Sequence, residues 1–203
     1  MSNFFNRMIV TVTVFALVSL AAAEDDRQPM EVLREGMNQG LAFLGDQTYR
    51  DGYGRAAQEA RIRELTMTLF DFTTMSRMVL SSYWDDFTAA QQAAFVQAFR
   101  AFLQNTYLPI LLERYDGERI EYLRQIKLST SRARVEIRVL HRRRTIPVDV
   151  KMIRRLGKWR IYDVNAMGFS AVAIYRAQFR WLLGKETPAQ VIERLQRSQG
   201  QPP

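Results

Sequence analysis

Few side chains in this sequence are of the types that carry out covalent chemistry. The chain of 203 residues has one histidine, His141, and no cysteine. A Ser-His-Asp triad needs a sheltered histidine base, and a Cys-His pair also needs a thiol. We expect His141 to lie in a solvent-facing hairpin loop, because the basic run from Arg142 to Arg144 follows it directly. The sequence therefore disfavours nucleophilic hydrolysis.

Carboxylates are the remaining candidates for acid–base chemistry. Asp85 and Asp86 form a tight acidic pair, and their place before a predicted helix is typical of helix capping. Asp163 lies in a predicted strand beside Tyr162. A lone carboxylate in an apolar pocket can act as a general base, but a strand position also suits a structural hydrogen-bond acceptor. Both interpretations of Asp163 stay open at this point.

Metal and nucleotide cofactors are not expected. The acidic residues are spread singly or along exposed helix faces, so they do not form a metal-ligand pattern. Neither a G-x-G-x-x-G nor a G-x-x-x-x-G-K-[ST] sequence occurs, and these are the glycine-rich loops that cradle phosphates.

Charge indicates an anionic partner. Lys and Arg total 29 against 21 Asp and Glu, which gives a formal net charge of +8. We predict that Arg143, Arg144 and Arg155 contact a membrane surface or a partner protein, with a merely solvated charged edge as the alternative. Nucleic acid is not expected, because the chain begins with an export signal and its aromatic residues lie at helical core spacing.

The first 23 residues have the features of a secretory signal peptide. Arg7 precedes the apolar stretch Met8–Leu20, and Ala21-Ala22-Ala23 supplies a cleavage site before Glu24. The apolar stretch is shorter than the roughly 20 residues that a spanning helix needs. We predict cleavage after Ala23, export, and one domain over residues 24–203 with a frayed tail at 199–203.

Apolar residues recur at helical spacing in the first half of the chain and again near its end. Helices are predicted over 29–44, 53–69, 72–80 with Asp71 as N-cap, 88–112 with a kink or break at Pro109, 170–183 and 187–195. Thr88 with Gln91, and Thr187 with Gln190, match capping boxes.

Beyond residue 117 the apolar period changes from 3.6 to 2. Strands are predicted over 118–128, 134–139, 146–152 and 159–164, with hairpin loops at 141–144 and 155–158. The predicted fold class is α+β: helices packed on one face of a curved antiparallel sheet of about four strands. Twelve Phe, nine Met, eight Tyr and three Trp can fill an ordinary core or line a cavity for a flexible ligand.

Several motifs, taken together, resemble a known family. They are Phe70-Asp71-Phe72-Thr73-Thr74-Met75, Tyr83-Trp84, Phe95 to Arg100, Ile146-Pro147-Val148-Asp149-Val150, Trp159-Arg160-Ile161-Tyr162-Asp163-Val164, Gly168-Phe169-Ser170 and Tyr175-Arg176-Ala177-Gln178-Phe179. Their order and spacing from about Pro29 to Leu195 resemble the Mla-type periplasmic phospholipid-carrier family, also called the toluene-tolerance auxiliary family. Phe169 departs from the smaller residue common in the family and is expected to narrow the pocket.

The resemblance implies a function without catalysis. Such carriers are monomeric periplasmic proteins that hold phospholipid acyl chains between helices and a curved sheet. They shuttle lipid between an outer-membrane lipoprotein complex and an inner-membrane ABC transporter complex with an MCE-domain subunit, and so maintain outer-membrane lipid asymmetry. The phospholipid is cargo, and no cofactor is implied.

Candidate lipid-binding residues come from the apolar faces of the predicted helices and strands. They are Phe72, Met75, Phe95, Phe99, Phe102, Leu103, Tyr107, Ile137, Val139, Val148, Val150, Ile161, Val164, Phe169, Val172, Tyr175 and Phe179. We expect the stripe Phe95, Phe99, Phe102 and Leu103 to face the strand residues Ile137, Val139, Val148 and Val150.

Two alternatives remain at the level of the sequence. One is a small α+β envelope enzyme with Asp163 as its base. The other is an interaction module with a filled core and no lipid.

Overall fold

The computed structural model describes residues 27–49 and 52–198. The predicted signal peptide at 1–23 and the predicted frayed tail at 199–203 lie outside the described residues. The described chain forms helices, then an antiparallel meander, then two more helices. The α+β class is therefore confirmed.

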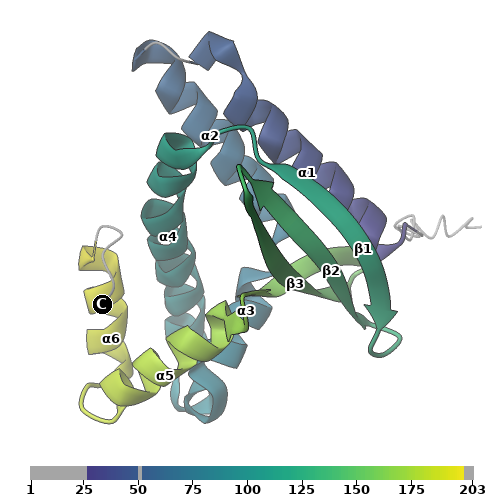
Figure 1. The fold of residues 1–203 in the computed structure, drawn as a ribbon. Helices are drawn as coiled ribbons and strands as arrows, with labels where there is room; N and C mark the ends of the chain where they lie inside the picture. The colour runs from purple at the N-terminus through teal and green to yellow at the C-terminus, as the bar shows by residue number, and fades with distance from the viewer. Residues whose placement is uncertain (1–26, 50–51, 199–203) are drawn as a thin grey trace, which may run out of the picture.

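The N-terminal part is helical. It consists of α1 (Pro29–Gly45), a short 3-10 turn η1 (Gln47–Tyr49), α2 (Gly52–Leu69), α3 (Phe72–Leu80), a second 3-10 segment η2 (Ser81–Asp86) and the long α4 (Ala89–Arg114). In Figure 1, α1 runs along one side of the sheet, and α4 stands on the other side of the fold.

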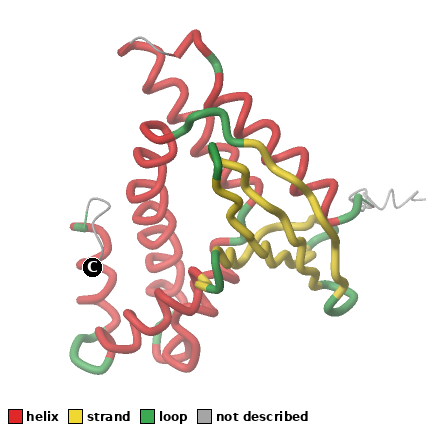
Figure 2. The backbone as a smooth tube through the Cα atoms, in the orientation of Figure 1, coloured by secondary structure: helices red, strands yellow, loops and turns green. Residues whose placement is uncertain are grey.

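The sheet follows α4 and is a simple meander. Its strands are β1 (Arg119–Lys127), β2 (Arg132–His141), β3 (Arg144–Arg155), β4 (Lys158–Ala166) and the two-residue β5 (Phe169–Ser170), in spatial order β1-β2-β3-β4-β5. The strands are drawn in yellow in Figure 2. The expected four strands are all present, and β5 is an addition because two residues are too short for an alternating pattern.

The chain ends in α5 (Ala171–Leu183) and α6 (Pro188–Arg197), which pack beside α4. Gly184 lies at the C-cap of α5, as expected, but with a right-handed φ of −72°.

Local capping signals are confirmed. The Thr88 hydroxyl accepts from the backbone N–H of Gln91, whose side chain accepts from the N–H of Thr88. Thr187 and Gln190 repeat this arrangement at α6. These reciprocal bonds satisfy backbone donors that a helix N-terminus otherwise leaves open.

Two local predictions need correction. The expected break at Pro109 is absent, because α4 continues through it to Arg114, while a kink there stays a prediction. Proline removes one backbone hydrogen bond, and the rest of a long helix can tolerate that loss. His141 ends β2 rather than lying in the loop, and its Nδ1 is 2.7 Å from Oε1 of Glu118. The hairpin turn is reduced to Arg142 and Arg143.

Candidate functional site

Buried apolar side chains form two separate clusters. The helical cluster draws on α3, α4, α5 and α6 and on Phe87 directly after η2, and the sheet cluster draws on α1 and strands β2 to β4. Phe70, between α2 and α3, packs against both. The backbone N–H of the next residue, Asp71, donates to the carbonyl of Ile161 over 2.8 Å, which anchors this junction to β4.

Aromatic rings dominate the helical cluster. Phe99 stacks on Phe95 and Phe102 at centroid distances of 5.7 and 6.2 Å, and it meets Tyr175 and Phe179 edge to face at 5.3 and 5.7 Å. Offset and edge-to-face pairs of this kind add to the free energy of burial. The α4 stripe is therefore held by α5.

The inner face of the sheet, the face that carries the sheet cluster, is defined by the strand register. Ile137 pairs with Val148, Val139 with Ile146, and Val150 with Val164. Because side chains alternate across a strand, paired residues share one face.

This inner face is covered unevenly. Ala133, Val135, Met152 and Ile161 are buried together with Leu33 of α1. Toward the Arg142–Arg143 hairpin, the residues Ile120, Val139, Ile146, Val148 and Val164 are half-buried. The sheet thus offers accessible apolar surface at one end of its inner face.

The expected contact between the α4 phenylalanines and the strands is not formed. Phe95, Phe99, Phe102 and Leu103 belong to the helical cluster, whereas Ile137 and Val150 belong to the sheet cluster. Helix α1 covers the sheet instead, through Leu33, and helices α3, α5 and α6 cover the α4 stripe.

The other candidate residues divide between these places. Met75, Val172, Tyr175 and Phe179 are buried in the helical cluster, with Phe72 packed on it, and Ile161 lies in the sheet cluster. Phe169 is 68% exposed, so it lies on the surface.

The C-terminal half of α4 exposes apolar side chains. Tyr107 is 47% exposed, and Ile110 and Leu111 are exposed to a similar degree. The Tyr107 hydroxyl lies 3.0 Å from the hydroxyl of Tyr175. Burial, and then this hydrogen bond, raise the pKa of Tyr175 far above its ordinary value. The pair joins α4 to α5 at the boundary between buried and exposed apolar surface.

Asp163 acts as a structural acceptor. Its carboxylate accepts from Lys151 Nζ at 3.0 Å, from Ser170 Oγ at 2.8 and 2.9 Å, and from the backbone N–H of Val172 at 3.1 Å. The side chain is almost completely buried. These bonds occupy both carboxylate oxygens, which leaves little capacity for a substrate proton.

The described residues show no metal site. Among residues 27–49 and 52–198, no three His, Asp or Glu side chains form a group that could hold a metal ion. Asp85 and Asp86 are exposed at the end of η2. None of the described helices is long and apolar enough to cross a membrane.

The three candidate contact arginines differ. Arg143 and Arg144 are exposed at the β2–β3 hairpin. Arg155 instead donates to Thr74 Oγ1 at 3.3 Å and lies 3.8 Å from Asp71 Oδ2, at the start of α3. Arg155 is exposed as well, but it has a structural ion-pair partner in the buried Asp71.

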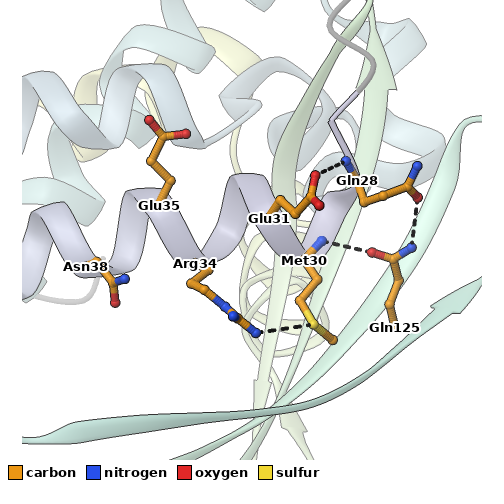
Figure 3. A pocket seen from close by; sticks show the side chains of 7 residues that line it. All are labelled: Gln28, Met30, Glu31, Arg34, Glu35, Asn38 and Gln125. Atoms are coloured by element: carbon orange, nitrogen blue, oxygen red, sulfur yellow. Dashed lines mark hydrogen bonds between the residues drawn. The ribbon is translucent and has the colours of Figure 1, made fainter.

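A surface hollow of about 520 Å³ lies where α1 meets β1. Figure 3 shows Gln125 of β1 accepting from the backbone N–H of Met30 and donating to Gln28. Six of the seven lining residues are polar or charged in type, but they present mostly apolar atoms to the hollow, and none of them is a candidate lipid-binding residue. The residues that line it are Gln28, Met30, Glu31, Arg34, Glu35, Asn38 and Gln125.

Comparison with known proteins identifies the family. The family model described as MlaC protein matches residues 35–197, most of the chain. The chain belongs to the MlaC family. No curated protein matches its sequence.

A solved structure shares the MlaC fold seen here. It is the phospholipid-binding protein from Ralstonia solanacearum in complex with a phospholipid, which matches with a TM-score of 0.74 and 18% identity. The match covers 86% of this chain and 98% of that chain. The architecture of this MlaC-family member is therefore that of the solved protein.

Sequence reasoning missed the residues that close the sheet cluster. Leu33 is fully buried against the strands, and Met30, Met37 and Phe70 pack on the same cluster. The helical spacing of Leu33 and Met37 does indicate an apolar face. It does not indicate which surface that face covers.

Proposed function

We propose that this MlaC-family protein is a periplasmic carrier that binds a phospholipid by its acyl chains. In this proposal it shuttles lipid between an outer-membrane lipoprotein complex and an inner-membrane ABC transporter complex with an MCE-domain subunit. The observation that carries the proposal is the half-buried apolar end of the inner sheet face, formed by Val139, Val148 and Val164.

The solved phospholipid complex of the same fold supports this proposal. Accessible apolar side chains also occur in two parts of the fold, the sheet and helix α4. Val139, Val148 and Val164 belong to the sheet, and Tyr107 and Leu111 belong to the C-terminal half of α4. We propose that the acyl chains lie between these two surfaces, with the buried aromatic cluster as the supporting wall.

Transfer energetics explain why such a carrier needs apolar surface but no catalytic group. A diacyl phospholipid has on the order of 30 methylenes, so at about 0.8 kcal/mol each its chains cost roughly 20 to 25 kcal/mol to expose to water. Covering the chains lowers this barrier. The phosphate headgroup can stay hydrated at the opening and needs few protein contacts.

The occupied carboxylate of Asp163 disfavours the alternative of an envelope enzyme. The two remaining alternatives differ in bound lipid: a carrier contains phospholipid, whereas an interaction module with a filled core does not. Organic extraction of the purified protein, followed by mass spectrometry and phosphate analysis, should recover phospholipid in near-stoichiometric amount. Protein without lipid that also fails to take up phospholipid from vesicles would refute the carrier.

A further inference from the structure

Helix α5 carries an exposed apolar stripe opposite its buried face. Val172, Tyr175, Phe179 and Leu182 are buried in the helical cluster. On the outer side Ile174, Ala177 and Trp181 are exposed, at helical spacing of three and four residues. The helix therefore has two apolar faces, and the protein covers one of them.

The β4–β5 turn, which directly precedes α5 in the sequence, also exposes apolar side chains. Met167 and Phe169 are 64% and 68% exposed. Met167 has a φ of +53° and is followed by Gly168 at +88°. Asn favours such a position in a two-residue turn, whereas Met is strained there. The turn therefore has local backbone strain at Met167, and the side chain at its tip is apolar and exposed.

The charged residues of the segment that carries this stripe are all basic, whereas the exposed Asp85 and Asp86 lie on η2, which contacts α5. From Val164 to Lys185 the chain has no acidic residue, and it contains Arg176, Arg180 and Lys185. Arg180 is exposed, and Lys185 Nζ lies 3.8 Å from the centre of the Trp181 ring. The turn also lies beside β3, because the backbone N–H of Met167 donates to the carbonyl of Pro147.

The exposed arginines of the β2–β3 hairpin lie at the same end of β3 as this turn. Arg144 begins β3 three residues before Pro147, and Arg143 precedes it in the turn. An apolar helix stripe with Trp, flanked in sequence by Lys and Arg, is typical of helices that lie in a lipid–water interface. Cations near such a stripe are attracted to anionic headgroups.

We propose that Met167, Phe169, Ile174 and Trp181 form a membrane-contact stripe that inserts into the headgroup region of an anionic bilayer. This inference rests on the proposed function, since it gives the carrier the surface through which it meets its lipid source. The turn at Met167 lies at the same end of the sheet as the half-buried Val148, so docking through this turn brings the accessible apolar surface close to the membrane.

Vesicle flotation tests the proposal with the full mature chain. The vesicles contain phosphatidylcholine and phosphatidylglycerol in a ratio of about 7 to 3. The stripe variant combines Met167→Asn, Phe169→Ser and Trp181→Gln, and Met167→Asn alone serves as a milder variant that suits its turn. Leu156→Asn is the matched control, because Leu156 is 98% exposed before Gly157 in the β3–β4 turn at the opposite end of the sheet.

We expect the wild type and Leu156→Asn to float equally, the stripe variant to bind at least about tenfold more weakly, and Met167→Asn to lie between them. Wild-type protein that does not float, or a stripe variant that floats like the wild type, overturns the proposal. So does a stripe variant that floats normally but loses binding to a purified protein partner, because the stripe is then a protein interface.

Phospholipid content measured on the same preparations separates this inference from the proposed function. We expect equal lipid loads in all four proteins. Loaded protein that does not float refutes the stripe and leaves the carrier intact. Protein that floats but neither contains nor takes up phospholipid refutes the carrier and leaves the membrane contact of the stripe intact.

Discussion

Asp163 of β4 accepts a hydrogen bond from the backbone N–H of Val172 in the first turn of α5, at 3.1 Å. The same carboxylate accepts from Ser170, which is the N-cap of α5. One buried side chain therefore fixes the angle at which the sheet passes into the helical cluster. A negative charge also suits a helix N-terminus.

Replacing Asp163 tests this structural role. Asp163→Asn removes the charge that pairs with Lys151 and weakens several hydrogen bonds, so we expect a loss of about 2 to 4 kcal/mol in unfolding free energy. Urea denaturation measures it. Asp149→Asn on β3 is the control and should cost under about 1 kcal/mol. A folded Asp163→Asn variant with unchanged stability would contradict the role.

A charge on the inner face of the sheet should block lipid binding. Val148→Asp places a carboxylate on half-buried apolar surface, where acyl chains would have to desolvate it, so bound phospholipid should fall at least about tenfold. The matched control is Thr145→Asp, on the opposite face of the same strand. Mass spectrometry of extracted lipid provides the readout. A normal lipid load in folded Val148→Asp would exclude this face from the site.

The aromatic cluster should contribute mainly to stability. Phe99→Ala leaves a cavity among four rings, and we expect a cost of about 3 to 5 kcal/mol. Phe169→Ala removes a ring from the surface and should change the stability by less than about 0.5 kcal/mol. Thermal or urea unfolding distinguishes the two. Equal effects would show that Phe99 is not held as the structure describes.

Tyr175 should make the protein sensitive to alkaline pH. Its pKa is raised in the folded state by burial and by the Tyr107 hydroxyl. Above about pH 10 the unfolded chain loses this proton while the folded protein keeps it, so stability falls as pH rises. The fall should be shallower in Tyr175→Phe than in the wild type. Parallel curves of unfolding free energy from pH 8 to 11 would contradict the assignment.

The hairpin arginines should control the rate of delivery rather than the amount of bound lipid. Reversing Arg143 and Arg144 to Glu should slow transfer to anionic vesicles at low salt, and the defect should shrink as salt rises. Reversal of Lys127 and Lys158, which are exposed at the other end of the sheet, is the control. Equal transfer rates for both double variants at low salt would mean that Arg143 and Arg144 form only a solvated edge.

Local features of the fold could be predicted from the sequence because their causes lie within a few residues. Thr88 and Gln91 satisfy each other's backbone donors, and the alternation around Val135 sets one face of a strand. These signals do not depend on which distant segment packs nearby. Similarly, Leu156 and Gly157 form the predicted turn between β3 and β4.

The packing between elements could not be predicted in the same way. The Phe99 stripe and the Leu33 face are both apolar at helical spacing, and nothing local decides which of them covers the sheet. In the sequence, Arg155 and Arg143 are both arginines in or next to a predicted hairpin loop. Only the structure distinguishes them, because Arg155 contacts Asp71. The apolar character of the candidate site could therefore be predicted from the sequence. The location of the site could be found only from the tertiary arrangement.

Photocrosslinking from the lipid tests the carrier model most directly. Wild-type protein is loaded with a phospholipid that carries a diazirine on one acyl chain, irradiated and digested, and the adducts are mapped by mass spectrometry. The model predicts adducts on the inner face of the sheet, at or beside Val139, Val148 and Val164, and on α4 near Tyr107 and Leu111. Loaded protein with adducts confined to the outer face of the sheet or to the hollow at Gln125 would contradict it.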